Sequence, residues 1–274
     1  YSSFDNIIVP SERAGLRKMQ RKVKKSIKKK PIIVGIVILS IITLMAAIGL
    51  KIIKISTLFA KTFLVQGVDV SHYQGEIDWE VLQMQNIDFA YIKATEGSSH
   101  VDEKFEENWK NASRTSLKIG AYHFFSFDSE GENQAENYIR TVGNLEGKLI
   151  PVIDVEYYGD KFRNPPDKEK VVEELKDMCV CLEREYGAKP MLYTTNTVYR
   201  KYLKGEFDFE EYPLWIRDVY FTPDITIRDQ WTIWQYSDTS ILKGYSGEEK
   251  YIDMNVFHGD LEELNDLLVE GFRD

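Results

Sequence analysis

Runs of β-branched and aromatic residues recur along the chain after residue 66, and amphipathic segments separate the first of them. The strand-like runs are 67–70, 89–95, 119–125, 149–156, 190–194, 213–219, 231–237 and 251–257, and the helix-like segments are 78–86, 102–116, 130–145 and 167–186. Strands that alternate with helices pair in parallel, and eight of them predict a closed barrel. Residues 220–230 and 238–250 show too little helical pattern for full crossovers. We therefore expect an α/β fold, an irregular (β/α) TIM-like barrel with some helices missing.

The stretch PIIVGIVILSIITLMAAIGL, residues 31–50, contains no charged residue. About 20 apolar residues rising roughly 1.5 Å each cross a hydrocarbon core of about 30 Å. A buried helix of a soluble protein would normally show a polar face, and this stretch has none. The sequence thus predicts a single transmembrane helix over residues 31–50, between a basic tail over 1–30 and a linker over 51–66. The barrel is expected over residues 67–274.

The charges around this stretch predict its orientation. The first 30 residues hold ten Lys and Arg against two acids, and only Lys51, Lys54 and Lys61 follow the stretch before residue 67. Because positive residues stay on the cytoplasmic side, we expect a single-pass plasma-membrane protein with a cytoplasmic amino terminus and an extracellular domain. Residues 31–50 are its expected contact with the lipid bilayer. A cleavable signal peptide is the alternative. Its apolar core is usually about 7–15 residues, so an uncleaved anchor is favoured.

The charge of the remaining chain excludes one class of partner. Because the first 30 residues carry a net +8 and residues 31–66 a net +3, the total of −9 leaves −20 for residues 67–274. So acidic a domain is poorly suited to bind nucleic acid or an anionic membrane surface. The two cysteines, Cys179 and Cys181, lie two apart on a predicted helix and do not face each other. We expect both to be reduced thiols.

Four acidic residues interrupt the strand-like runs. Asp69 lies in GVDVS, Asp154 and Glu156 in VIDVE, and Asp253 in YIDMN. In a (β/α) barrel the chemistry lies at the carboxyl ends of the strands. Asp154 and Glu156 fall on one face of their strand, with Cα atoms about 6.6 Å apart at about 3.3 Å per residue. Two carboxylates that close raise one of their pKa values, and a general acid requires a raised pKa.

A structural role and a metal site are the two alternatives to acid–base chemistry for these acids. A single Asp is usually a cap or a surface charge, but burying four without a function would cost several kcal/mol each. A calcium or magnesium site is a rival, although Tyr, Trp and Phe surround the acids where neutral oxygen ligands would be expected. Acid–base chemistry is therefore favoured, and no metal or cofactor is expected.

Aromatic residues on or near the strands suggest the substrate. They are Tyr122, Tyr193, Trp215, Trp234 and Tyr236. About half of such residues belong to a hydrophobic core. Flat aromatic faces beside several carboxylates are nevertheless typical of a sugar-binding cleft, and a pair of carboxyl groups is the usual equipment for glycosidic bond hydrolysis.

Several motifs together carry a family resemblance. The segments GVDVSHYQGEIDW, FAYIKATEGSSHVDEKFEENWKNA, IGAYHFF, PVIDVE, WQYS and IDMNVF occur in this order at barrel-like spacing. They resemble glycoside hydrolase family 25, the lysozymes of the Chalaropsis type, over residues 67 to about 259. The resemblance implies hydrolysis of the β-1,4 bond between N-acetylmuramic acid and N-acetylglucosamine in peptidoglycan. His100 and Ser116 depart from the common pattern, but neither is one of the carboxylates.

The resemblance also implies roles for individual residues. Glu156 matches the general acid and Asp154 its partner carboxylate, while Asp69 and Asp253 match the other two active-site acids. His72 is expected beside the site or at its rim rather than as a catalyst.

Further residues match the sugar subsites of the family less directly. They are Tyr122, Trp234, Lys93 and Glu96. The leading hypothesis is a membrane-anchored, outward-facing muramidase that remodels the wall or opens it locally for a secretion or conjugation machine. A catalytically silent peptidoglycan-binding anchor of such a machine and a glycosidase of chitin-like polymers are the alternatives.

Overall fold

A computed structural model describes residues 10–49, 54–223 and 231–271, and the chain divides into two compact units, Tyr1–Ile53 and Lys54–Asp274. The first unit contains one long helix, α1 (Pro10–Gly49). The predicted transmembrane segment is helical up to Gly49, and residue 50 lies outside the described residues. Within the described part of the chain, no helix combines the length and the apolar character that a membrane span requires.

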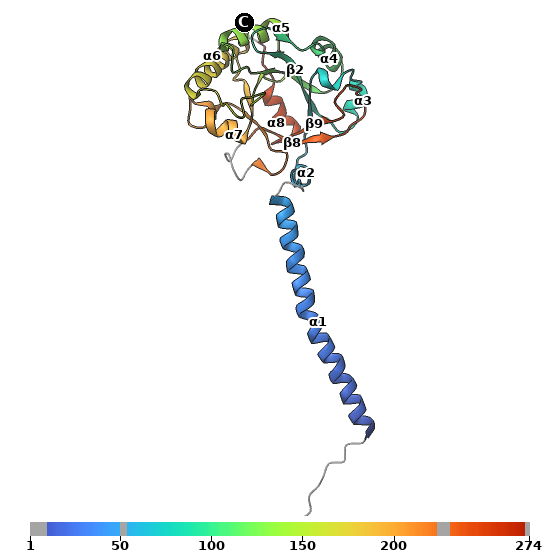
Figure 1. The fold of residues 1–274 in the computed structure, drawn as a ribbon. Coiled ribbons are helices and arrows are strands. Elements are labelled where there is room, and N and C mark those ends of the chain that lie inside the picture. Colours follow the sequence, from blue (N-terminus) through green and yellow to red (C-terminus); the bar gives the residue numbers. More distant parts are fainter. Residues whose placement is uncertain (1–9, 50–53, 224–230, 272–274) are drawn as a thin grey trace, which may run out of the picture. The chain divides into compact units, whose positions relative to one another are not determined.

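The second unit is a closed barrel, as the sequence predicts (Figure 1). Among the described residues its eight strands are β1 (Gln66–Val70), β2 (Phe89–Glu96), β4 (Lys118–Phe124), β5 (Val152–Val155), β6 (Met191–Thr195), β7 (Leu214–Arg217), β8 (Ile233–Ser240) and β9 (Ile252–Phe257). They are ordered β1-β9-β8-β7-β6-β5-β4-β2, and β1 pairs with β2 to close the ring. A short additional strand, β3 (His100–Val101), pairs with the end of β2.

The last strand runs against the others, which the sequence analysis did not predict. β9 pairs antiparallel with both β1 and β8, whereas β1 pairs parallel with β2. The physical reason is the connection before β9, which contains no helix and therefore turns the chain back beside β8 instead of crossing over. As a result, the start of β9 lies at the end of the barrel where the parallel strands finish. Asp253 is consequently the direct cross-strand neighbour of Asp69.

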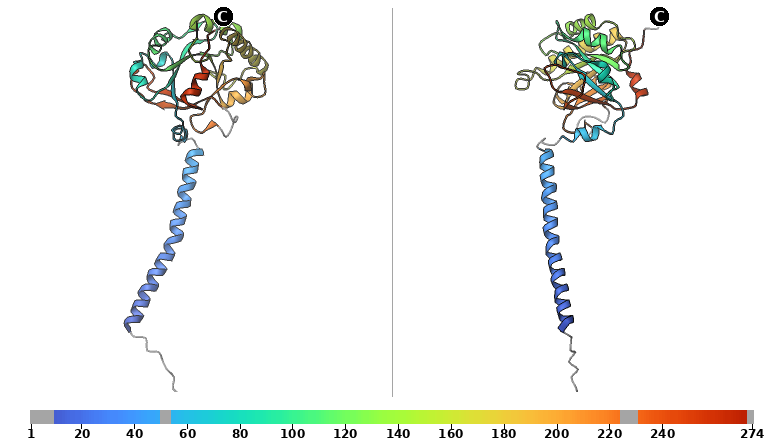
Figure 2. Two further views of the ribbon diagram at one scale, coloured as in Figure 1. Left: turned by 180° about the vertical axis from the view of Figure 1, so that it is seen from behind. Right: turned by 90° about the vertical axis from the view of Figure 1, so that its right-hand side faces the viewer.

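Helices cover the outside of the barrel (Figure 2). The four predicted helices are present, each within its predicted segment, as α3 (Trp79–Gln83), α4 (Phe105–Ala112), α5 (Gly131–Val142) and α6 (Lys168–Tyr186). Shorter helical turns are η1 (His72–Gln74), α7 (Asn196–Val198), η2 (Tyr199–Leu203), η3 (Phe209–Glu211), α8 (Leu261–Leu264) and η5 (Asn265–Leu267). The long helix α6 begins where the Asp167 side chain accepts a hydrogen bond from the Lys170 amide at 3.1 Å. It ends at Gly187, whose φ of 67° favours glycine.

Part of the predicted linker belongs to the folded unit. Residues 51–53 lie outside the described residues, but α2 (Ser56–Ala60) packs on the barrel. Ala60 and Val65 are buried, and the Ser56 hydroxyl donates to the Val219 carbonyl oxygen at 2.7 Å. The folded unit therefore starts at Lys54 rather than Gly67, because this short segment has apolar side chains to bury.

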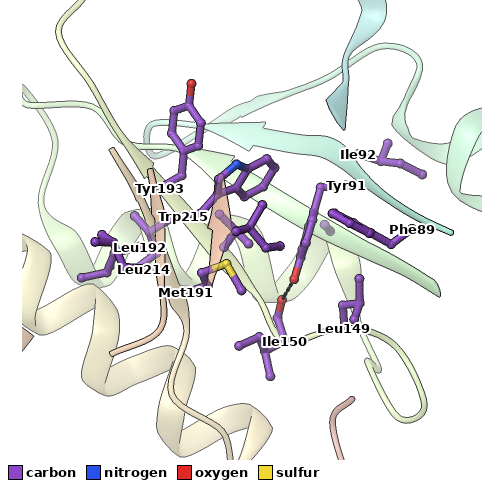
Figure 3. Close-up of a cluster of buried hydrophobic side chains, with 14 of the residues drawn as sticks. Phe89, Tyr91, Ile92, Leu149, Ile150, Met191, Leu192, Tyr193, Leu214 and Trp215 are labelled. Carbon is purple, nitrogen blue, oxygen red and sulfur yellow. Dashed lines mark hydrogen bonds between the residues drawn. The ribbon is translucent and has the colours of Figure 1, made fainter. Parts of the chain in front are cut away.

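The interior of the barrel is filled by an aromatic column (Figure 3). The rings of Phe89, Tyr91, Trp215 and Tyr193 follow one another, with centroids 6.4, 5.1 and 5.1 Å apart. Gly120 makes room for the column, because a Cβ atom there would overlap the Tyr91 ring. The Tyr91 hydroxyl, a polar atom inside the column, donates to the Ile150 carbonyl oxygen at 3.2 Å. Trp215 and Tyr193 then form part of the floor of a cleft.

The two cysteines occupy the α6 helix as expected. Cys179 is buried, Cys181 is half-buried, and both are free thiols in the structure. Burial raises the pKa of the Cys179 thiol well above its usual value, so this thiol is neutral and packs as a small apolar side chain.

Candidate active site

A cleft of about 370 Å³ lies where the parallel strands end. All four predicted carboxylates line it: Asp69 from β1, Asp154 from β5, Glu156 just after β5, and Asp253 from the start of β9. Asp154 and Glu156 thus share a face, as their spacing predicts. The other lining residues are Val70, Ser71, Tyr73, Gln74, Lys93, Tyr122, Phe124, Val152, Tyr193, Trp215, Asp238, Glu249 and Tyr251.

Two amide side chains hold Asp69 in place. Gln235 Nε2 donates to its Oδ1 at 3.0 Å, and Asn255 Nδ2 donates to the same oxygen at 2.7 Å. Each amide is oriented in turn by an aromatic residue: the Tyr193 hydroxyl donates to Gln235 Oε1 at 3.0 Å, and Trp215 Nε1 donates to Asn255 Oδ1 at 2.9 Å. Because each amide oxygen is already occupied, each NH₂ group must point at Asp69. The network fixes the position of this carboxylate.

The Asp154 carboxyl group is buried but incompletely satisfied. It is 7% exposed, and its Oδ1 atom has no hydrogen-bond partner. Burial raises the pKa of Asp154 well above its ordinary value, and the negative charge of Glu156 raises it further. Burial also raises the pKa of Glu156, against the opposing effect of the Arg217 charge. The pair therefore retains a proton at a pH where isolated carboxyl groups have lost theirs.

The remaining acids behave in the same way. Burial, followed by the charge of Asp69, raises the pKa of Asp253 to about 8, while Arg217 opposes the shift. Burial raises the pKa of Asp69, although its hydrogen bonds from Asn255 and Gln235 lower it in part. Four carboxyl groups that share one cleft repel one another when they are ionised. Some of them therefore stay protonated at a pH where isolated carboxyl groups are ionised.

Three of the predicted aromatic residues, Tyr122, Tyr193 and Trp215, line the cleft, as does Lys93. The Lys93 ammonium pairs with Glu96 at 2.7 Å. Glu96 itself is not among the lining residues, and its side chain is 42% exposed. Its ion pair with Lys93 links it to a residue that lines the cleft.

Two other predicted sugar-binding residues do not reach the cleft. Trp234 and Tyr236 flank Gln235 on β8, and since Gln235 points inward, its neighbours point out of the barrel. Trp234 is fully buried and its Nε1 atom donates to the Asp218 carbonyl oxygen at 2.8 Å, while the Tyr236 hydroxyl donates to Gln66 Oε1 at 3.2 Å. Both residues belong to the packing outside the barrel, so their assignment to a subsite is corrected.

Sequence reasoning missed the two amides that hold Asp69, although a signal for them exists. Gln235 and Asn255 lie inside otherwise buried strands, where an amide needs partners. Asn255 is also two positions after Asp253 and so shares its face. The rim residues of the cleft are Tyr73, in the short turn η1, and Glu249 and Tyr251, on an irregular segment. None of these stretches is long enough or regular enough for periodicity to indicate the direction of a side chain.

His72 lies beside the cleft and is not one of its lining residues. Its Nδ1 atom pairs with Asp102 at 2.7 Å, and its ring lies 4.1 Å from that of Tyr73, which does line the cleft. Asp102 also accepts a hydrogen bond from the His72 amide at 3.1 Å. These contacts make His72 a support for the rim.

Among the residues that the structure describes, no three His, Cys, Asp or Glu side chains are arranged to hold a metal ion. The lining groups offer protons, charges and aromatic surface. Those are the components of acid–base chemistry on a neutral, ring-shaped substrate.

Comparison with known proteins decides the family. Residues 68–245 match the family described as Glycosyl hydrolases family 25. The chain belongs to this family. A solved structure of a family 25 glycosyl hydrolase from Bacillus anthracis is 50% identical, with a TM-score of 0.70, and covers 75% of this chain and 94% of that one. The protein is thus a glycoside hydrolase with the barrel of family 25.

Curated relatives match over most of their length. Lysozyme M1 of Streptomyces globisporus is 30% identical over 220 residues, which are 75% of this chain and 71% of the relative. YegX of Escherichia coli K12, described as uncharacterized, is 34% identical over 218 residues, which are 78% of this chain and 76% of YegX. The family match, residues 68–245, lies within the barrel unit and does not include α1.

Proposed function

We propose that this glycoside hydrolase is a muramidase that cleaves the β-1,4 bond between N-acetylmuramic acid and N-acetylglucosamine in peptidoglycan. The observation that carries the assignment is the group of four carboxyl groups with raised pKa values in one aromatic-lined cleft. The relative from Streptomyces globisporus is named a lysozyme, which supports the same substrate.

Glu156 is the proton donor in this proposal. Its longer side chain reaches further than that of Asp154 toward a glycosidic oxygen, and burial raises its pKa, which favours the protonated form that a general acid needs. Arg217 and Lys93 oppose the rise, so the proton remains available for transfer. A general acid must hold its proton before the reaction and release it during the reaction, and a pKa near the working pH allows both.

Asp154 then orients the substrate. Retaining enzymes with a carboxylate nucleophile place the two groups about 5–5.5 Å apart, and inverting enzymes about 6.5–9.5 Å, on opposite faces of the sugar. Two acids at the end of one strand can hardly straddle a ring, so ordinary inversion is disfavoured. In our scheme the 2-acetamido oxygen of the substrate attacks the anomeric carbon as Glu156 protonates the departing oxygen. Asp154 holds and polarises that amide, and water later opens the cyclic intermediate with retention.

Analysis of the ends that the enzyme creates tests this function. The full chain, in mild detergent, is incubated with purified peptidoglycan, and the new reducing ends are converted to sugar alcohols and identified. Muramic-acid ends, absent with Glu156→Gln, are the expected result. Glucosamine ends would indicate another bond, cleavage of chitin oligosaccharides alone would indicate a chitin-like substrate, and binding without new ends would indicate a silent anchor.

We also propose that residues 31–50 tether the enzyme to the plasma membrane, with the amino terminus in the cytoplasm and the barrel outside. The support is the uncharged stretch and the basic residues before it. Large apolar side chains over residues 33–45 of α1 are half or more exposed, which is unfavourable in water. A tether would confine hydrolysis to the wall nearest the membrane, as local remodelling or the passage of a secretion or conjugation machine requires.

Protease protection tests the tether separately from the chemistry. Protease added outside intact cells should remove the barrel and leave a membrane-bound stub that carries residues 1–30. A barrel released into the medium with a new amino terminus near Lys61 would show a cleaved signal peptide instead.

A further inference from the structure

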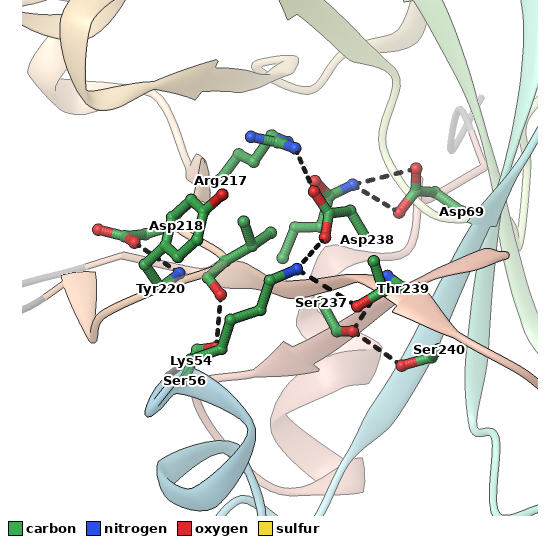
Figure 4. Close-up of polar contacts among 12 residues, drawn as sticks. Lys54, Ser56, Asp69, Arg217, Asp218, Tyr220, Ser237, Asp238, Thr239 and Ser240 are labelled. Atoms are coloured by element: carbon green, nitrogen blue, oxygen red, sulfur yellow. Dashed lines mark hydrogen bonds and ion pairs between the residues drawn. The ribbon is translucent and has the colours of Figure 1, made fainter. Parts of the chain in front are cut away.

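One carboxylate at the edge of the cleft is shared by two cations from distant parts of the chain (Figure 4). Asp238, on β8, lines the cleft. Its Oδ1 atom pairs with the Lys54 ammonium at 2.6 Å, and its Oδ2 atom pairs with the Arg217 guanidinium at 2.8 Å. Lys54 also donates to the Thr239 hydroxyl at 3.3 Å. Both oxygens of Asp238 are therefore occupied, one by each cation.

The segment that carries Lys54 is fixed to the barrel beside this carboxylate. The amides of Ile55 and Ser56 both donate to the Tyr220 carbonyl oxygen, at 3.1 and 3.2 Å, and the Ser56 hydroxyl donates to the Val219 carbonyl oxygen. The Lys54 ammonium lies 5.5 Å from the centre of the Tyr220 ring. These contacts hold the backbone of residues 54–56 against the segment after β7. Residues 54–56 precede the match to family 25, which starts at residue 68.

Arg217 is one of the cations that act on the catalytic acids, together with Lys93. It ends β7, and its charge lowers the pKa values of Asp69, Glu156 and Asp253 against the effect of burial. The charge of Asp238 has the opposite effect on Asp253. The charged or titratable groups that influence Arg217 come from every neighbouring part of the cleft: Tyr193 on β6, Asp238 on β8, Glu156 after β5 and Asp253 on β9.

We propose that Lys54 is a positioning residue of the active site, which holds Asp238 so that Asp238 holds Arg217 beside the catalytic carboxyl groups. The inference rests on the proposed hydrolase function and adds to it a segment outside the family domain. Without Lys54, Asp238 has one cation left and turns both oxygens toward Arg217, which draws the guanidinium away from the acids. The edge of the cleft also loses the positive charge that Lys54 places beside Asp238.

Neutral substitution of Lys54, with a matched control, tests the proposal in the full chain. Lys54→Met keeps the aliphatic stem and removes the charge, and Lys61→Met makes the same change at an exposed lysine of the same segment. For Lys54→Met, kcat/KM on peptidoglycan at the pH optimum should fall about two- to fivefold, through kcat rather than KM, as fits a partly exposed ion pair. Both limbs of its pH profile should move to higher pH. Lys61→Met should have the kcat/KM and the pH profile of the wild type. Lys54→Arg keeps the positive charge and should also retain the activity of the wild type.

A double variant tests whether Lys54 acts through Asp238. In an Asp238→Asn background, Lys54→Met should cause no further change, because its partner no longer carries a charge. Equal additional losses in both backgrounds would overturn the relay. A lowered melting temperature for Lys54→Met with an unchanged pH profile would also overturn it, because the ion pair would then be only structural.

A titration that needs no turnover separates this inference from the proposed function. In protein labelled with ¹³C at the Asp carboxyl carbons, Asp253 should titrate at higher pH in Lys54→Met than in the wild type or Lys61→Met. Identical titrations would overturn the proposal even if the enzyme is active. A wild-type enzyme without activity on peptidoglycan would instead contradict the proposed function and leave the titration to decide on Lys54.

Discussion

Two polar clusters lie within the barrel unit, and they differ in how their atoms are satisfied. In the structural cluster, defined as Thr95, His123, Ser126 and Gln134, each side chain has a partner. Thr95 Oγ1 and His123 Nδ1 are 2.7 Å apart, and His123 Nε2 lies 3.1 Å from Gln134 Oε1. Gln134 also accepts from the Ser126 amide and donates to the Ser126 carbonyl oxygen. In the cleft, by contrast, Asp154 keeps a buried oxygen without a partner.

The same cause, burial, therefore has opposite consequences in the two places. Burial lowers the pKa of His123 to about 4, so the imidazole is neutral and its two nitrogens suit a donor and an acceptor on either side. In the cleft, burial raises the pKa values of acids that also repel one another. A buried polar cluster in which every group has a hydrogen-bond partner is typical of a structural role. Buried groups of like charge without full sets of partners are typical of a functional site.

The largest effect expected from this difference is on turnover. Glu156→Gln should reduce hydrolysis of intact glycan by about 10³-fold or more, because the amide cannot donate a proton to the leaving oxygen. On a substrate with an activated leaving group, which needs no protonation, the turnover of Glu156→Gln should be much closer to that of the wild type. Asp154→Asn should be impaired on both substrates, because its role is to orient and polarise the acetamide. Steady-state kinetics on the two substrates measures both effects.

The division of labour between the two acids depends on the contrast between their responses. If Glu156→Gln and Asp154→Asn respond equally to leaving-group activation, the two roles are assigned wrongly. Melting temperatures of both variants should be unchanged or higher, since each removes one charge from a crowded site.

The structural cluster should show the reverse pattern. His123→Ala leaves Gln134 and Thr95 without their shared partner and opens a cavity, so the free energy of unfolding should fall by about 2–4 kcal/mol. Activity per folded molecule should change little. Denaturant unfolding measures the loss, with His100→Ala as the control because this histidine is exposed. A large loss of kcat in folded His123→Ala would place the cluster in the catalytic machinery and remove the distinction.

The parts of this molecule that the sequence could predict follow from local pattern. The barrel follows from alternating strand and helix periods, and the place of the acids follows from their position at strand ends. The direction of β9 could not be predicted, because it depends on how an irregular connection folds. Asp253 lies directly across from Asp69, and it arrives from an antiparallel strand rather than from the carboxyl end of a parallel one.

Side-chain direction is the other limit on prediction. An irregularity in β2 between Lys93 and Thr95 shifts the register against β4, so Lys93 faces the cleft while Thr95 meets His123 in the structural cluster. β8 is irregular as well, because its register against β9 shifts between Gln235 and Ser237 and again between Ser237 and Ser240. Two aromatic residues suggested a sugar platform, whereas the amide between them, Gln235, is the residue that faces the site.

The smallest expected effect is a dependence of the free energy of unfolding on pH, and it arises from Asp253 in the cleft. The pKa of Asp253 is about 8 in the folded protein against an ordinary value of 3.8. Between those values the native state binds more protons at this site than the unfolded state does. The contribution of Asp253 to stability is thus fully present below pH 3.8 and is lost as the pH rises through about 8.

Asp253→Asn cannot ionise and should escape this loss. Its free energy of unfolding should equal that of the wild type near pH 4 and exceed it by about 1–3 kcal/mol at pH 8 and above, less than an isolated group would give because neighbouring acids share the proton. Urea unfolding at a series of pH values measures the difference. Asp266→Asn makes the same substitution at an exposed aspartate outside the cleft and is the control. A constant offset between Asp253→Asn and the wild type would show that Asp253 ionises normally, and the cleft would then resemble the structural cluster in being electrostatically relaxed.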